Sequence, residues 1–158
     1  IVNEKDEVIG YKERSKVTKE NIYRVSALWL TNYDGKVLLA KRAKTKSHDP
    51  GKWGPAAAGT IEEDESYEEN IAHEAAEEIG LTGYEFTKGP KYLNKDNHNH
   101  FTQWFFLKIK EDYNFVLNDE VEEVKWWDLE ELSNTLEDNA SEFLVKMPEY
   151  VNQFSKSL

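Results

Sequence analysis

The hydrophobic residues follow two patterns along the chain, one typical of strands and one typical of an amphipathic helix. Runs rich in β-branched and aromatic residues are typical of strands, and they occupy residues 24–32, 36–42, 101–109 and 121–127. The Asp34-Gly35 pair between the first two runs favours a hairpin turn, because such residues accept the positive φ of tight turns. Between residues 66 and 79 the apolar positions fall within half of a helical wheel, which predicts an amphipathic helix that ends at Gly80.

The rest of the chain adds shorter elements to this pattern. Residues 1–3 and 7–11 predict a small N-terminal β-hairpin, and residues 43–55 predict a polar surface loop with Pro-Gly and Gly-Pro turns. Further helices are expected at residues 129–136 and 141–154. We therefore expect an α+β fold, with helices packed on a central mixed sheet, in a single domain that spans residues 1–158.

The composition restricts the chemistry that such a fold can carry. With 39% hydrophobic residues the chain has enough apolar surface for a core, and the absence of cysteine excludes disulfides, thiolate zinc sites and a cysteine nucleophile. The formal charge of −11 argues against nucleic acid as a partner, because clustered Lys and Arg bind backbone phosphates. No stretch is apolar enough to span a bilayer and no signal sequence opens the chain, so we expect a cytoplasmic protein without a membrane partner.

Three glutamates share one edge of the helix predicted over residues 66–79. Glu74, Glu77 and Glu78 are spaced i, i+3 and i+4, so their side chains form one acidic patch. Like charges at this spacing destabilise a helix by about 0.2 to 0.5 kcal/mol per pair, so the patch is either a solvated face or a site for a cation. A solvated face is the commoner case, but carboxylate oxygens are also the ligands that Mg²⁺ takes in proteins.

The residues around this patch resemble a known signature. Residues 59–81 follow the Nudix box, G-x5-E-x7-R-E-U-x-E-E-x-G-U with U a bulky aliphatic residue, at every fixed position except two. The resemblance implies a Nudix-type α/β/α sandwich whose loop-helix-loop holds Mg²⁺ or Mn²⁺ through Glu74, Glu77 and Glu78. It also implies hydrolysis of a diphosphate bond in a nucleoside diphosphate linked to another moiety.

Two positions depart from the signature. Ala75 replaces the first aliphatic residue, which is a mild change, and His73 stands where the family has Arg. The resemblance implies that residue 73 pairs with Glu65 and that both, with Gly59, support the box. A histidine has an ordinary pKa near 6.5, so we expect this pairing to depend on pH, whereas an arginine would stay charged.

The segment before the box resembles one branch of the family. Residues 42–59 are similar in order and spacing to the type I isopentenyl-diphosphate isomerases and their hydrolase-like relatives, which implies that Arg42 and Lys46 contact a diphosphate. The isomerases use a cysteine as an acid/base residue and a histidine as a metal ligand, where this chain has Ala58 and Thr60. We therefore favour hydrolysis over isomerisation.

The sequence leaves the general base open. Glu77 and Glu78 are candidates within the box, and Glu120, Glu122 and Glu123 are candidates outside it. Glu120 resembles a recurrent family position, although a solvated strand end is the commoner explanation for such a residue. A non-catalytic alternative also stays open, since some Nudix-like domains bind a nucleotide as sensors, usually after losing the box glutamates that this chain keeps.

The remaining polar and aromatic residues indicate less. His98 and His100 lie in a polar loop that we expect to be exposed, although both would reach one face, near substrate or a second metal, if the next strand begins early. Aromatic residues at 104–106 and 126–127 are expected in the core rather than stacked on a base. The expected partner is a small-molecule diphosphate, and the sequence leaves open whether the chain forms a homodimer.

Overall fold

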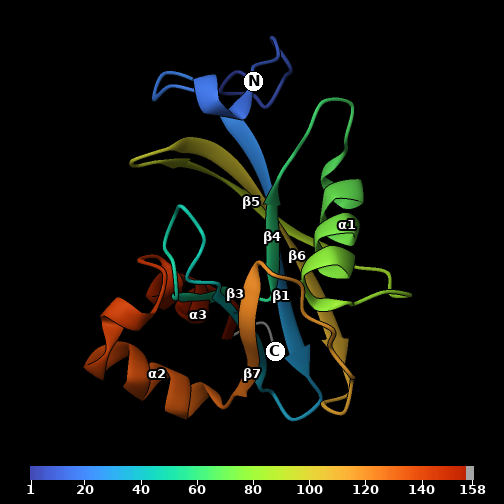
Figure 1. Ribbon diagram of the computed structural model, residues 1–158, viewed down its shortest axis with the longest axis vertical. Coiled ribbons are helices and arrows are strands. Elements are labelled where there is room, and N and C mark those ends of the chain that lie inside the picture. Colours follow the sequence, from blue (N-terminus) through green and yellow to red (C-terminus); the bar gives the residue numbers. More distant parts are fainter. Residues whose placement is uncertain (156–158) are drawn as a thin grey trace.

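The computed structural model describes residues 1–155, so the last three residues of the expected domain lie outside the described part. Figure 1 shows the strands gathered into one sheet with helices on both sides. The strands are β1 (Tyr23–Asn32), β2 (Val37–Arg42), β3 (Trp53–Pro55), β4 (Ala57–Thr60), β5 (Thr87–Lys95), β6 (Asn99–Ile109) and β7 (Val121–Trp127). The helices are α1 (Tyr67–Ile79), α2 (Leu129–Asp138) and α3 (Met147–Phe154), with 3-10 turns at Arg14–Lys16 and Ala140–Glu142. Among residues 1–155, no helix is long and apolar enough to cross a membrane.

Strand β1 determines the shape of the sheet. β6 pairs with β1 in parallel along its whole length, and β5 pairs with the outer edge of β6. The opposite edge of β1 is shared, because β4 pairs with residues 25–28 and β2 pairs with residues 30–31. β3 and β7 extend the sheet from β2. The sheet therefore forks between β4 and β2, close to the middle of β1.

Helices cover both faces of the sheet, which confirms the expected α/β/α sandwich (Figure 1). α1 covers one face, where Ile71, Ala75 and Ile79 pack against apolar residues of β1 and β2. α2 and α3 cover the other face, and the core there combines aromatic and aliphatic side chains: Trp29, Trp104, Trp127, Leu132, Leu136, Phe143, Met147, Val151 and Phe154. Successive side chains of β1 thus supply two cores, because they point to opposite faces of the sheet.

The C-terminal helix is shorter than the sequence predicts. The expected helix over residues 141–154 is wrong in its first half, since α3 begins only at Met147. Phe143 forms an isolated β-bridge with Trp53, so the chain is extended there instead of helical. Pro148 then occupies the first turn of α3, where a missing backbone N–H is tolerated.

The structure contains three strands that the sequence did not predict, β3, β4 and β5. The loop expected over residues 43–55 ends in β3, because residues 53–55 pair with β2. Strand β5 was not predicted, since its residues are mostly polar and Gly89-Pro90 interrupts any alternation. The pairing of β5 with β6 shifts register at this Gly-Pro step. The N-terminal hairpin is present in a short form, as an isolated bridge between Val2 and Val8.

One carboxylate fastens the N-terminal segment to the rest of the protein. Asp6 Oδ1 accepts a hydrogen bond from Arg24 Nε on β1 at 2.7 Å. Its Oδ2 accepts from Lys91 Nζ on β5 at 2.7 Å and from the hydroxyl of Tyr67, the first residue of α1, at 3.0 Å. Burial alone would raise the pKa of Asp6, but these hydrogen bonds outweigh it and lower the pKa below its ordinary value. We call these four side chains the Asp6 clamp.

Local sequence defines both ends of α1. The hydroxyl of Ser66 accepts from the N–H of Glu69, and the Glu69 carboxylate accepts from the N–H of Ser66 in return. This capping box satisfies two backbone donors at the start of the helix. Gly80 ends the helix with a φ of 68°, a left-handed conformation that favours glycine.

A buried asparagine ties α1 to the sheet. Asn70 is 1% exposed, and its amide oxygen accepts from the hydroxyl of Ser26 on β1. Its amide nitrogen donates to the carbonyl oxygen of Thr60 on β4 at 3.1 Å and to Oε1 of Glu65 at 2.9 Å. One side chain therefore fixes β1, β4 and the loop before α1 relative to one another.

We expect Asn70→Ala to lower the free energy of unfolding by about 1 to 3 kcal/mol, because buried partners would lose their hydrogen bonds. Urea unfolding at neutral pH measures this change. Asn134→Ala is the matched control, since Asn134 is an exposed residue of α2. Equal stability of the two variants would show that the Asn70 bonds contribute nothing.

Candidate active site

The acidic edge of α1 lies against the backbone of β4. Glu78 Oε1 accepts a hydrogen bond from the N–H of Ala58 at 3.3 Å, and the carboxyl groups of Glu74 and Glu78 are in hydrogen-bond contact. Glu74 also lies over Gly59, where a Cβ atom would come within 2.4 Å of its carboxyl carbon. Gly59 is thus required because helix and strand approach closely. Glu77 is exposed beside the Glu74–Glu78 pair.

Burial and mutual repulsion make this pair hard to ionise. Burial, followed by the charge of Glu74, raises the pKa of Glu78 to about 8. Burial also raises the pKa of Glu74, and the charges of Glu77 and Glu120 add to the effect. A nearby positive charge would favour the ionised forms of both groups.

The donor set fits a hard divalent cation. Glu74 and Glu78 present carboxylate oxygens side by side in a place where their own charges need compensation, and oxygen is the ligand that Mg²⁺ and Mn²⁺ prefer. Within residues 1–155, no three Asp, Glu or His side chains are already gathered into a metal-ligating cluster. A three-glutamate site therefore requires the exposed Glu77 side chain to turn toward the pair.

A cavity of about 50 Å³ lies at the fork of the sheet. Its lining comes from β2, β3, β4, α1 and the start of β7, and it includes four charged candidates, Arg42, Lys46, Glu78 and Glu120. Lys46 Nζ lies 3.0 Å from Oε2 of Glu120. Arg42 Nε donates to the carbonyl oxygen of His48 at 3.0 Å, which braces the loop after β2. The fold thus brings both predicted diphosphate contacts to a box glutamate and to Glu120.

The other two outside carboxylates are placed differently. Glu122 Oε atoms lie 3.9 Å from Lys41 Nζ and from Lys44 Nζ, and Glu123 is exposed on β7. Glu120 is the one of the three that lines the cavity. The geometry therefore favours Glu120 over Glu122 and Glu123 as a base outside the box.

The two loop histidines do not share a face near the carboxylates. β6 begins at Asn99, so His98 lies in the turn before it and is exposed, with its ring centroid 5.9 Å from that of His48. His100 is half-buried and stacks on Tyr23 with centroids 5.2 Å apart. Neither residue lines the cavity at the fork.

His73 and Glu65 contact each other, as the resemblance to the Nudix box implies. His73 Nδ1 lies 3.1 Å from Oε2 of Glu65. Burial would raise the pKa of Glu65, but hydrogen bonds from the Glu62 N–H, from Asn70 and from His73 together lower it. The same hydrogen bond to Glu65 raises the pKa of His73. Asn70 is the supporting residue that the sequence did not indicate, because it is polar and lies among the apolar positions of the wheel.

Known proteins are similar to this chain in sequence and in fold. The NUDIX domain profile matches residues 21–147. The "Uncharacterized Nudix hydrolase YfcD" of Salmonella typhi is 31% identical over 135 residues, which cover 84% of this chain and 73% of the relative. A "Prenyl-diphosphate phosphatase" of Methanosarcina mazei is 30% identical over 132 residues, which cover 80% of this chain and 76% of the relative. The crystal structure of DR0079 from Deinococcus radiodurans has a TM-score of 0.78 at 24% identity, over 96% of this chain and 95% of that one.

A glutamate-bearing helix packed on a forked mixed sheet is the architecture of a Nudix domain, and the chain belongs to the Nudix family. Its relatives identify it as a Nudix phosphohydrolase. The closer resemblance to the isomerase-like branch stays a prediction from the sequence.

The close approach at Gly59 generates a test of the carboxylate site. We expect Gly59→Ala to displace Glu74 and to weaken the apparent affinity for Mn²⁺ by about 10- to 100-fold, the range typical of disturbed ligand positioning. Titration of the protein with Mn²⁺, followed by electron paramagnetic resonance, measures the affinity. Gly10→Ala is the control, because a Cβ there meets no atom within 4 Å. If Gly59→Ala leaves the affinity for Mn²⁺ unchanged, Glu74 is not a metal ligand.

The Glu65–His73 pair predicts a pH dependence. Because the folded pKa of His73 is raised, the pair stabilises the fold fully below the ordinary pKa of about 6.5, and this contribution disappears as pH rises through the raised value. An arginine would keep its charge, so His73→Arg is expected to retain or raise activity and melting temperature above neutral pH. Activity and melting temperature across pH 6 to 9 are the measurements. A loss of activity in His73→Arg at high pH would assign His73 another role.

Proposed function

We propose that this protein hydrolyses a diphosphate bond, with Mg²⁺ or Mn²⁺ as cofactor, in a nucleoside diphosphate linked to another moiety. The observation that supports this most strongly is the cavity at the fork, which three basic residues, Lys41, Arg42 and Lys46, line together with Glu78 and Glu120. The basic residues suit the anionic diphosphate, and the carboxylates suit the cation that would neutralise it.

The residues divide into distinct roles under this proposal. Glu74, Glu77 and Glu78 would hold the cation, which supplies charge neutralisation of the diphosphate and a more acidic water when bound. Arg42 and Lys46 would bind the phosphate oxygens. Gly59, Glu65 and His73 would keep the box in position, as described above.

In this scheme the substrate breaks the ion pair between Lys46 and Glu120. Their ion pair at 3.0 Å is partly exposed, so it contributes little stability and breaks easily. A phosphate oxygen that binds Lys46 Nζ would free the Glu120 carboxylate to accept the proton of the attacking water. We therefore place Glu120 ahead of Glu77 and Glu78 as the general base, because the box glutamates would be engaged as cation ligands under this proposal.

A prenyl diphosphate is the second candidate substrate. The Methanosarcina mazei relative is named a prenyl-diphosphate phosphatase and is similar over most of this chain. Hydrolysis of a prenyl diphosphate would use the same basic and acidic residues, so the cavity at the fork does not separate the two classes.

Isomerisation and pure ligand sensing are weaker alternatives. Ala58 and Thr60 occupy the positions of the acid/base cysteine and the ligating histidine of the similar isomerases. Neither side chain could perform those roles, because an alanine has no acid group and a hydroxyl replaces the imidazole. A sensor would bind a nucleotide without turnover, so a turnover assay separates it from an enzyme.

The proposal is tested by a substrate panel with Mg²⁺ or Mn²⁺. The panel contains nucleoside diphosphates and triphosphates, dinucleotides, nucleotide sugars and prenyl diphosphates, and the products are separated by chromatography. We expect metal-dependent hydrolysis of a nucleoside-diphosphate compound that falls by at least about 100-fold in Glu78→Gln. Glu137→Gln is the control, because Glu137 is exposed on α2.

Each other outcome contradicts a stated part of the proposal. Turnover that survives Glu78→Gln would remove the box from catalysis. Conversion of isopentenyl diphosphate to its isomer would establish an isomerase. Tight nucleotide binding without turnover in any metal would establish a sensor.

A further inference from the structure

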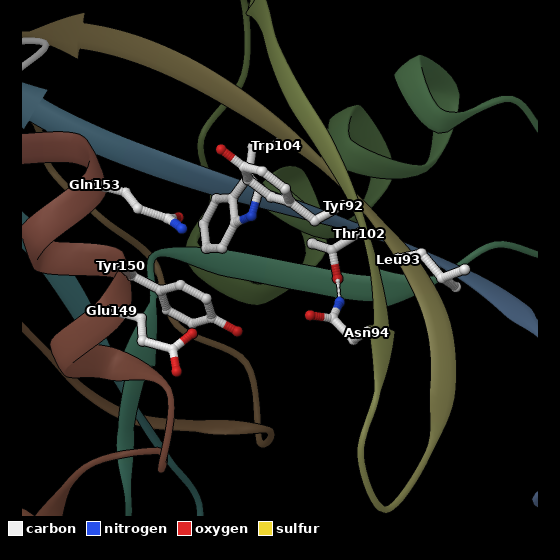
Figure 2. A pocket seen from close by; sticks show the side chains of 8 residues that line it. All are labelled: Tyr92, Leu93, Asn94, Thr102, Trp104, Glu149, Tyr150 and Gln153. Atoms are coloured by element: carbon white, nitrogen blue, oxygen red, sulfur yellow. Dashed lines mark hydrogen bonds between the residues drawn. The ribbon is translucent and has the colours of Figure 1, made fainter.

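A second cavity, of about 220 Å³, lies between α3 and the β5–β6 hairpin. Figure 2 shows Glu149, Tyr150 and Gln153 of α3 on one side, Asn94 of β5 and Thr102 of β6 on the other, and Trp104 of β6 between them. Tyr92 and Leu93 of β5 complete the lining. Pockets for whole drug-sized ligands measure about 300 to 1,000 Å³, so this cavity suits one part of a substrate.

Ala58, which lines the cavity at the fork, and Trp104, which lines the second cavity, point to the same face of the sheet. Ala58 on β4 is directly opposite Ala27 on β1, and Ala27 is in register with Trp104 on β6. Residues in register point to the same face, and all three side chains belong to or pack against one core. Two strand spacings separate Ala58 from Trp104, or about 10 Å. Ala58 lines the fork cavity and Trp104 lines the second one.

The lining of this cavity is aromatic and polar rather than aliphatic. Leu93 is the one aliphatic side chain among the eight that line it. Tyr92, Glu149 and Gln153 are exposed and Tyr150 is half-buried, so their polar side-chain atoms are open to water at the cavity. A prenyl chain would cover these atoms without replacing their bonds to water, which is unfavourable.

The charged residues at the second cavity differ from those at the fork, because among residues 1–155 Glu149 has no free basic residue beside it. Lys146 lies near the second cavity, but it is paired with Asp96 at 3.0 Å and donates to Asn94 at 2.8 Å. Glu149 therefore leaves this cavity acidic, which disfavours a phosphate and favours N–H donors. Burial raises the pKa of Tyr150 to about 12, so its hydroxyl stays protonated and can donate.

We propose that the cavity between α3 and the β5–β6 hairpin binds the nucleobase of the substrate, with Glu149 accepting from a base N–H and Tyr150 hydrogen-bonding its edge. The inference rests on the proposed function, since the diphosphate would lie at the fork, about two strand spacings from the cavity that would hold the base. It selects the nucleoside class over the prenyl class.

The test measures binding without metal, so it does not depend on turnover. We expect adenosine, guanosine or cytidine monophosphate to bind at least about tenfold tighter than ribose 5-phosphate, by isothermal titration calorimetry. Glu149→Gln is expected to weaken nucleotide binding by about tenfold and Tyr150→Phe by about fivefold, as expected for a lost charged and a lost neutral hydrogen bond. Neither variant should alter ribose 5-phosphate binding.

Matched controls keep the test specific. Glu142→Gln removes an exposed carboxylate outside the cavity, and Tyr84→Phe removes an exposed hydroxyl elsewhere. Tyr150→Phe preserves the ring contact with Trp104, whose centroid lies 4.7 Å away, so the variant retains the packing of α3. With an active substrate, the two cavity variants should raise KM and leave kcat within about twofold.

Three results would overturn the inference. These are equal binding of nucleotide and ribose 5-phosphate, nucleotide binding that both variants leave unchanged, and tighter binding of dimethylallyl monophosphate that depends on Tyr150. Absence of nucleotide hydrolysis in the substrate panel would instead refute the proposed function, and the binding result would still decide whether the cavity recognises a base.

Discussion

A single strand edge can hydrogen-bond only one partner at each position, and this constraint on β1 shapes the whole protein. β4 takes the first part of that edge and β2 takes the second, so the sheet opens between them. The opening is where the cavity with Glu78, Lys46 and Glu120 lies. Asn70 then holds α1 at the β4 side of the fork. The site is thus a consequence of how β1 is paired, and the helix supplies its acidic groups.

The carboxylates of this site are placed against their own electrostatic preference. Glu74 and Glu78 touch each other in a partly buried position, although the chain has ample exposed surface for acidic residues. Such strained placement is typical of functional sites, where local stability is given up for reactivity. Exposed carboxylates elsewhere, such as Glu68 and Asp96, have a lysine beside them instead of a second carboxylate, and their pKa values are lowered.

The sequence predicted what is local and missed what depends on distant partners. The apolar periodicity over residues 66–79 and the ending residue Gly80 placed α1 to within one residue, because both signals act within a few residues. β5 was missed because its strand character comes from pairing with β6, and the start of α3 was misplaced because Phe143 bridges to Trp53. The contact between Lys46 and Glu120 and the cavity beside α3 join segments far apart in the chain, so no local pattern could indicate their geometry.

The Asp6 clamp joins residues on both sides of the boundary at which the family match begins. The family match starts at residue 21, yet Asp6 lies before it and binds side chains of β1, β5 and α1 that lie within it. A fragment cut at the family boundary would leave Arg24 and Lys91 without their shared anion, close to the start of α1. The N-terminal segment therefore contacts the matched region through buried and charged hydrogen bonds, although it lies outside the residues that the family profile covers.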